Sequence, residues 1–176
     1  MRKAINNLSV AMTASLLVAC SNPTASTSEQ ATGGAGPMRS SLVNATIESS
    51  FSQAIAACAN YVVSGTSLSS LGSYGFQPSG SKYIIALENP DVLGNSKVVA
   101  APRRDECRVT ASPTNFRDNN TVASWVEPAL IRADFEKRLR PLNEYVAETY
   151  FVKNGVAVDL RRSSGGGGTN VILKRQ

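Results

Sequence analysis

Apolar side chains recur at three- and four-residue intervals between Val43 and Val62, the spacing that places them on one face of an α-helix. The pattern predicts a long helix over residues 44–63, and Gly65 stands where a left-handed residue commonly ends a helix. We expect the apolar face of this helix to pack on another element. The face consists of Val43, Ile47, Phe51, Ala54, Ile55, Cys58 and Val62.

Three later segments predict β-strands, namely residues 82–88, 97–101 and 106–111. In the first and the third segment, every second residue is apolar, which is the period of a half-buried strand. The second is a short run that Pro102 ends. Between the helix and the first of these strands, residues 66–71 suit a single extra helical turn. Residues 74–80 are rich in glycine and contain a proline, so they predict an irregular connection.

A second helical pattern covers residues 121–139 and contains Pro128. Because proline lacks an N–H group and its ring crowds the preceding turn, Pro128 either kinks one helix or begins a second one. We favour the break, with a second helix that carries Ile131, Phe135 and Leu139 on its apolar face. A helix or helix pair is therefore expected in this region.

The last part of the chain predicts three further strands. Residues 145–152 and 156–161 flank Asn154-Gly155, a dipeptide that suits a two-residue type I′ hairpin turn. Four consecutive glycines at residues 165–168 are expected to form a loose link to a final strand at residues 169–174.

This order of helices and hairpin-connected strands predicts the α+β class. We expect an antiparallel sheet of short strands, with one long N-terminal helix and a second helix or helix pair packed on it. The predicted domain is single and spans residues 37–176. Residues 20–36 consist mainly of small and polar residues, which bury too little apolar surface to fold, so they are expected to form a disordered tether.

A leader precedes the tether. Arg2 and Lys3 are followed by a mostly apolar run over residues 4–19, and the run ends in Leu17-Val18-Ala19-Cys20. These are the three parts of a secretory signal. The final four residues resemble the lipobox of bacterial lipoproteins. The resemblance implies that residues 1–19 are removed as a signal peptide and that the thiol of Cys20 carries diacylglycerol, with palmitate among its fatty acids.

Two other interpretations of the leader remain open. It can be an ordinary secretory signal that is cut a few residues further on. It can also be a membrane-spanning anchor, although such an anchor requires about 20 predominantly apolar residues and polar side chains interrupt this run.

The resemblance to bacterial lipoproteins also bears on location. In lipoproteins with serine after the cysteine, as at Ser21 here, the resemblance implies transfer to the outer membrane. The expected location is the cell envelope, on the outer membrane facing the periplasm.

The three cysteines are Cys20, Cys58 and Cys107. If Cys20 carries lipid, the other two form an even pair in a compartment where disulfides persist. Cys58 lies in the apolar face of the first helix and Cys107 lies on the inward face of the third strand, so a helix packed on the sheet brings them together. The sequence predicts a Cys58–Cys107 disulfide that closes a loop of about 50 residues and contributes roughly 4 kcal/mol. Two free, buried thiols are the alternative.

Composition excludes several function classes. Histidine is absent, which excludes histidine-based acid–base catalysis, Ser-His-Asp triads and histidine-ligated metal sites. The chain carries 18 Lys and Arg against 13 Asp and Glu, a formal net charge of +5, of which Arg2 and Lys3 belong to the leader. This charge is too weak to indicate a nucleic-acid partner. No cofactor or metal motif is recognisable, so none is expected.

Two patterns leave catalysis open. Ser79-Gly80-Ser81-Lys82 matches the Ser-x-x-Lys pattern of penicillin-binding proteins and β-lactamases, but it lies at a predicted turn and the Lys-Thr-Gly partner motif is missing. The acidic residues suit a solvated, mixed-charge surface better than a catalytic pair. Trp125, the single tryptophan, is expected in the core. The acids in question are Glu127, Asp134, Glu136, Glu144 and Glu148.

The sequence therefore favours a membrane-anchored, non-catalytic module that binds an envelope protein or another envelope component. An envelope hydrolase that uses carboxylates or a Ser–Lys pair is the alternative. Exposed sheet edges or a basic C-terminal hairpin are the expected contact surface, and protection of the sheet edge by these charges is the competing interpretation. The basic residues are Arg161, Arg162, Lys174 and Arg175.

Overall fold

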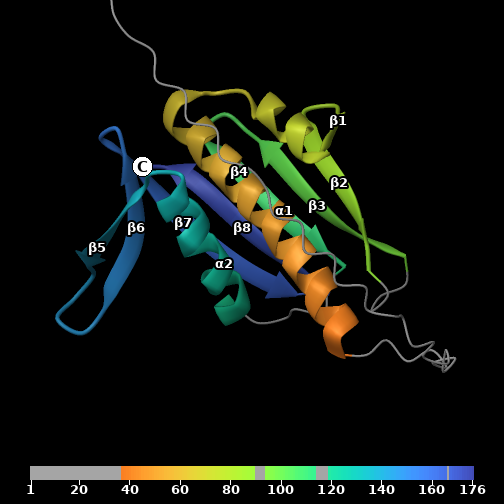
Figure 1. Ribbon diagram of the computed structural model, residues 1–176. Coiled ribbons are helices and arrows are strands. Elements are labelled where there is room, and N and C mark those ends of the chain that lie inside the picture. Colours follow the sequence, from red (N-terminus) through yellow and green to blue (C-terminus); the bar gives the residue numbers. More distant parts are fainter. Residues whose placement is uncertain (1–36, 90–93, 114–118, 166) are drawn as a thin grey trace, which may run out of the picture. The chain divides into compact units, whose positions relative to one another are not determined.

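The computed structural model describes residues 37–89, 94–113, 119–165 and 167–176 (Figure 1). Side chains are described from Ala45 onward, except at positions 119, 120, 122 and 123. All described residues belong to one compact unit, Gly34–Gln176. The predicted signal peptide, the lipidated Cys20 and the tether lie outside the described residues.

The first element is the helix α1 (Pro37–Ser64). The side chains predicted to face inward are buried from Ile47 to Val62, so the helical period is confirmed. Gly65 ends the helix with a φ of 70°, and its N–H donates to the carbonyl of Tyr61 at 2.7 Å. The helix begins before the expected Asn44, at Pro37, because proline is well suited to the first turn, where its missing N–H costs nothing.

A 3₁₀ helix, η1 (Leu68–Tyr74), occupies the place of the expected extra turn. Four strands follow in an antiparallel meander. The strand β1 was not predicted, because its three exposed residues show no alternation. The strands are β1 (Gln77–Ser79), β2 (Lys82–Glu88), β3 (Asn95–Pro102) and β4 (Glu106–Ser112).

The second helix, α2 (Asn119–Arg132), passes through Pro128 without ending there, so the predicted break at Pro128 is wrong. The N–H that Pro128 lacks leaves the carbonyl of Ser124 without its helical donor. Both side chains are exposed, so that carbonyl lies on the side of the helix where solvent can satisfy it.

The predicted continuation of this helix to Leu139 is also wrong. Asp134 adopts a left-handed conformation with a φ of 63°, and the N–H of Phe135 donates to the carbonyl of Leu130 at 3.0 Å. This bond pattern, with Leu130 and Phe135 both buried, ends the helix as a glycine would. Aspartate tolerates this conformation better than most residues, and the chain then enters a strand.

The remaining strands form a second antiparallel meander. Asn154 and Gly155 have φ values of 52° and 75°, which confirms the type I′ turn. The prediction of a loose link at residues 165–168 is wrong, because Gly165 pairs with Gly168 across a tight hairpin. The strands are β5 (Glu136–Pro141), β6 (Ala147–Lys153), β7 (Val156–Gly165) and β8 (Gly168–Arg175).

Together the strands form one eight-stranded antiparallel sheet in the order β1-β2-β3-β4-β8-β7-β6-β5. Each meander follows a helix, and the two meanders meet where β4 pairs with β8. The helices α1 and α2 lie on the same face, with α1 running across β3, β4 and β8 (Figure 1). The mixed α+β class is therefore confirmed.

The core fills the space between the helices and the sheet. Cys58 of α1 and Cys107 of β4 form the predicted disulfide, with their Cα atoms 5.3 Å apart. Trp125 of α2 is 6% exposed and meets the ring of Phe51 edge-on, with centroids 5.9 Å apart, so its predicted core role is confirmed. The disulfide and the ring pair each join α1 to a different partner element.

Candidate binding surface

The four basic residues predicted as a contact surface lie on two faces of the sheet. Arg162 and Arg175 pair with Val171 and Val158, whose side chains point toward the helices. Strand partners share a face, so both arginines belong to the helix-bearing side. Arg161 and Lys174 are offset by one residue and belong to the opposite face. All four are exposed, and their role in binding stays a prediction.

A different surface concentrates exposed apolar side chains. In the described part of the chain, six large apolar residues are at least half exposed, and four of them belong to the hairpin of β5 and β6. We call the segment from Leu139 to Val146 the hairpin tip. Its exposed apolar side chains are Leu139 (64%), Leu142 (60%), Tyr145 (86%) and Val146 (50%).

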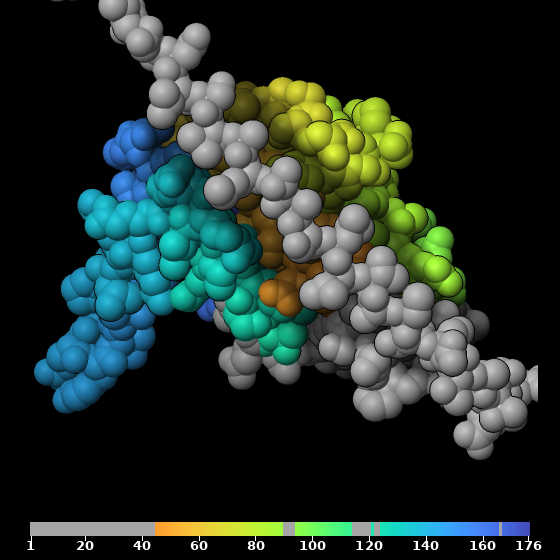
Figure 2. Space-filling model, viewed as in Figure 1, coloured from red at the N-terminus to blue at the C-terminus, as the bar shows by residue number. Residues whose placement is uncertain are grey.

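The hairpin extends away from the two helices. Figure 1 shows β5 and β6 at the left of the sheet, with their connecting loop at the lower left. The space-filling view shows the same blue-cyan segment projecting at the lower left (Figure 2). β5 is also the terminal strand of the sheet, so the hairpin is one of the exposed sheet edges expected from the sequence.

The loop of the hairpin has a defined conformation. The side-chain oxygen Oδ1 of Asn143 accepts hydrogen bonds from the N–H groups of Tyr145 and Val146, at 2.9 and 2.8 Å. The N–H of Leu142 donates to the carbonyl of Val146 at 2.8 Å. An asparagine that binds the backbone two and three residues ahead closes a turn by itself. The apolar side chains are therefore displayed from a closed turn.

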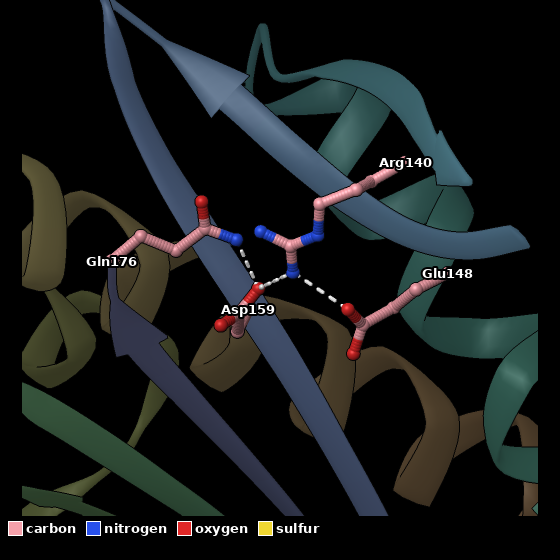
Figure 3. Close-up of polar contacts among 4 residues, drawn as sticks. All are labelled: Arg140, Glu148, Asp159 and Gln176. Carbon is pink, nitrogen blue, oxygen red and sulfur yellow. Dashed lines mark hydrogen bonds and ion pairs between the residues drawn. The ribbon is translucent and has the colours of Figure 1, made fainter. Parts of the chain in front are cut away.

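A charged network fixes the arms of the hairpin on the face opposite the helices (Figure 3). Arg140 of β5 lies 2.6 Å from the carboxylate of Glu148 on β6 and 3.3 Å from that of Asp159 on β7. The side-chain amide of Gln176 donates to the same carboxylate of Asp159. The hydrogen bond to Glu148 is the main reason that the pKa of Arg140 is raised. The network connects both arms to β7 and the C-terminus.

Contacts on the helix-bearing face hold the base of the hairpin. Lys137 of β5 lies 2.8 Å from the carboxylate of Glu127 on α2. The Nζ of Lys153 on β6 donates to the carbonyl of Ala133 at 2.6 Å and to Oδ1 of Asn60 on α1 at 3.0 Å. The hairpin is thus attached at its base on the helix-bearing face and through Arg140 on the opposite face, while the apolar side chains of its tip are left exposed.

Of the acidic residues considered for catalysis, Glu127, Glu136 and Glu148 form ion pairs, whereas Glu144 lies at the tip and Asp134 ends α2. Asp134 and Glu136 line a cavity of about 650 Å³ at the base of the hairpin, together with Arg138 and Lys153. The hydrogen bond from Arg138, at 2.7 Å, lowers the pKa of Glu136. A carboxylate held in its ionised form is unsuited to act as a general acid. Glu127 pairs with Lys137 and Glu148 pairs with Arg140.

The Ser-x-x-Lys pattern forms a turn. Ser79 pairs with Lys82 across the β1–β2 hairpin, and Gly80 between them has a φ of 59°. In the families with this motif the serine begins a helix, so the geometry differs. Among the described residues, no group of three acidic or cysteine side chains is placed to hold a metal ion.

Comparison with known proteins finds no match among models of protein families, curated proteins or solved structures. Within the described ranges, no helix has the length and apolar character needed to cross a membrane.

Proposed function

We propose that the protein is a lipid-anchored envelope lipoprotein whose folded domain works as a non-catalytic binding module. Anchoring through Cys20, and location on the outer membrane facing the periplasm, follow from the resemblance of Leu17-Val18-Ala19-Cys20 to a lipobox. The tether over residues 20–36 then lets the domain reach a partner at some distance from the membrane.

One observation supports binding most strongly: the tip of a well-fixed hairpin carries four large, exposed apolar side chains. Exposed apolar patches on soluble domains commonly mark interaction sites. The hydrolase alternative receives no comparable support, because Glu127, Glu136 and Glu148 neutralise lysine and arginine side chains. Ser79 pairs with Lys82 across a turn and does not begin a helix.

Two measurements test the proposal. Cys20→Ala should leave an uncut precursor and abolish labelling by a fatty-acid analogue, whereas labelling that survives would exclude anchoring at Cys20. For binding, partners that co-purify with the full-length protein from detergent-solubilised membranes are compared before and after Leu142→Ser/Tyr145→Ser. Tyr74→Ser/Ile131→Ser, which removes exposed apolar side chains elsewhere, is the control. Loss with the first pair only is expected, and equal retention by both would contradict binding at the tip.

A further inference from the structure

We infer that the hairpin tip inserts as a preformed plug into an apolar pocket of an envelope protein, and that a basic residue of this partner pairs with Glu144. The inference rests on the proposed function, since it names the kind of partner that the binding module takes. Three features of the tip support it: its size, its fixed shape and its single uncompensated charge.

Size indicates a pocket. A stable interface between two proteins usually engages about 20–30 residues on each side, whereas the tip offers four large apolar side chains. Such a small group contributes strongly to binding when it is fully desolvated in a pocket, where tyrosine is among the favoured anchors. Tyr145, at 86% exposure, is the most exposed of the large apolar residues in the described ranges.

Fixed shape lowers the cost of insertion. The two hydrogen bonds that Asn143 accepts from Tyr145 and Val146 hold the loop closed before any partner arrives. Ordering a flexible loop during association costs binding free energy, and a loop that is already ordered avoids this cost. The conformation that exposes the apolar side chains of the tip therefore depends on Asn143, whose side-chain oxygen binds the backbone.

Charge defines the pocket further. Lys137, Arg138 and Arg140 on β5 each have a carboxylate partner within 2.8 Å. Glu144 is exposed and makes no hydrogen bond or ion pair with any described residue. The tip thus carries one uncompensated negative charge beside Tyr145, and a basic residue at the rim of the pocket complements it.

The same charge disfavours two other occupants. An anionic lipid surface attracts uncompensated lysine and arginine side chains and repels Glu144. In a symmetric contact between two copies of this chain, the same patch meets itself, so the two tips would bring two Glu144 carboxylates together. A protein pocket with a cation at its rim avoids both repulsions.

The test uses photo-cross-linking in membranes that contain the full-length protein. A photoreactive phenylalanine analogue is placed at Tyr145 and, in a matched control, at Tyr74, which is also an exposed tyrosine. We expect an adduct with another protein from position 145 and none from position 74. In the chain with the analogue at position 145, Glu144→Lys should lower the yield of this adduct by about tenfold or more. Glu88→Lys makes the same charge change in β2 and should leave the yield unchanged.

Asn143→Ala supplies a second readout, since it should lower the adduct yield several-fold without removing any apolar contact side chain. An adduct with lipid alone, an adduct with a second copy alone, or no adduct from position 145 would overturn the inference. A yield that is insensitive to Glu144→Lys would also overturn it. If adducts arise instead from analogues placed at Arg161 or Lys174, the proposed binding function stands and only the tip is excluded. If no position gives an adduct with a protein, both fail.

Discussion

The two halves of the domain repeat one order, a helix followed by a four-stranded meander, but they use their apolar residues differently. The 28-residue α1 covers its own meander and also reaches β7 and β8. The 14-residue α2 contacts β5 and β7, while the hairpin tip between β5 and β6 stays exposed. Apolar side chains of the first half are therefore mainly buried, while those of the hairpin tip in the second half are exposed.

Different interactions hold the two regions. Around α1, buried aliphatic and aromatic side chains surround a disulfide that joins α1 to β4. In the hairpin of β5 and β6, ion pairs, backbone pairing and the turn at Asn143 define the shape. Apolar burial dominates stability, whereas exposed ion pairs contribute little. The comparison teaches that the first region supports the fold and the hairpin tip is free to bind.

The largest expected effect is that of Phe51→Ala. Phe51 is fully buried in α1 and packs on Trp125, so its truncation should lower the free energy of unfolding by about 3–5 kcal/mol. Leu142→Ala, on the exposed tip, should change it by less than about 0.5 kcal/mol. Urea unfolding of the purified domain measures both. Similar losses for the two variants would remove the distinction between the regions.

The disulfide should contribute almost as much. Replacing Cys58 and Cys107 together by serine removes a cross-link between residues 49 positions apart. The chain-entropy model predicts a loss of about 4 kcal/mol in the free energy of unfolding. Unfolding of this double variant, compared with the oxidised wild type, gives the value. In non-reduced wild-type protein, mass spectrometry should show the two linked peptides, and native alkylation of both thiols would contradict the bridge.

A smaller effect is expected where the two meanders meet. A Cβ atom at Gly168 would lie 2.6 Å from Cβ of Ser112 and 3.1 Å from the carbonyl oxygen of Ala111, so Gly168→Ala should destabilise by about 1–3 kcal/mol. Gly165, its strand partner, has open space at the same atom. Gly165→Ala is thus a matched control that should change stability by less than about 0.5 kcal/mol in thermal unfolding. Equal effects would show that the close approach is unimportant.

The smallest effect concerns the charges of the hairpin. The hydrogen bond and charge of Arg138 lower the pKa of Glu136 in the folded state. A lowered folded-state pKa means that this pair stabilises the hairpin above the ordinary pKa of the acid and that the contribution is lost as pH falls through the folded-state value. Arg138→Gln should return the pKa of Glu136 toward its ordinary range in an NMR titration. An unchanged pKa would show that the pair is not maintained in solution.

Elements with an uninterrupted period could be predicted from the sequence. The face from Ile47 to Val62 is buried as its helical spacing indicates, and the positive φ values of Asn154 and Gly155 are those that this dipeptide favours. The disulfide could be predicted from the helical period around Cys58 and the strand period around Cys107, because each placed its cysteine on an inward face. These predictions depend on local patterns that the tertiary structure did not override.

The hairpin could not be predicted in the same way. Asp134 ends α2 in a conformation that usually calls for glycine, so the boundary between α2 and β5 carried no strong sequence signal. Leu139 and Tyr145 are residue types that commonly lie on a buried face, yet they are 64% and 86% exposed. That the basic residues lie on two faces of the sheet could have been predicted from the sequence, because adjacent strand residues such as Arg161 and Arg162 point to opposite faces.

The central claim is that the hairpin tip serves binding and not folding, and one variant tests both parts together. For Leu142→Ser/Tyr145→Ser, the free energy of unfolding and the co-purification of membrane partners are measured on the same preparation of full-length protein. We predict a free energy of unfolding within about 0.5 kcal/mol of the wild type and loss of the partners. A variant that is equally stable and retains its partners in full would contradict the claim.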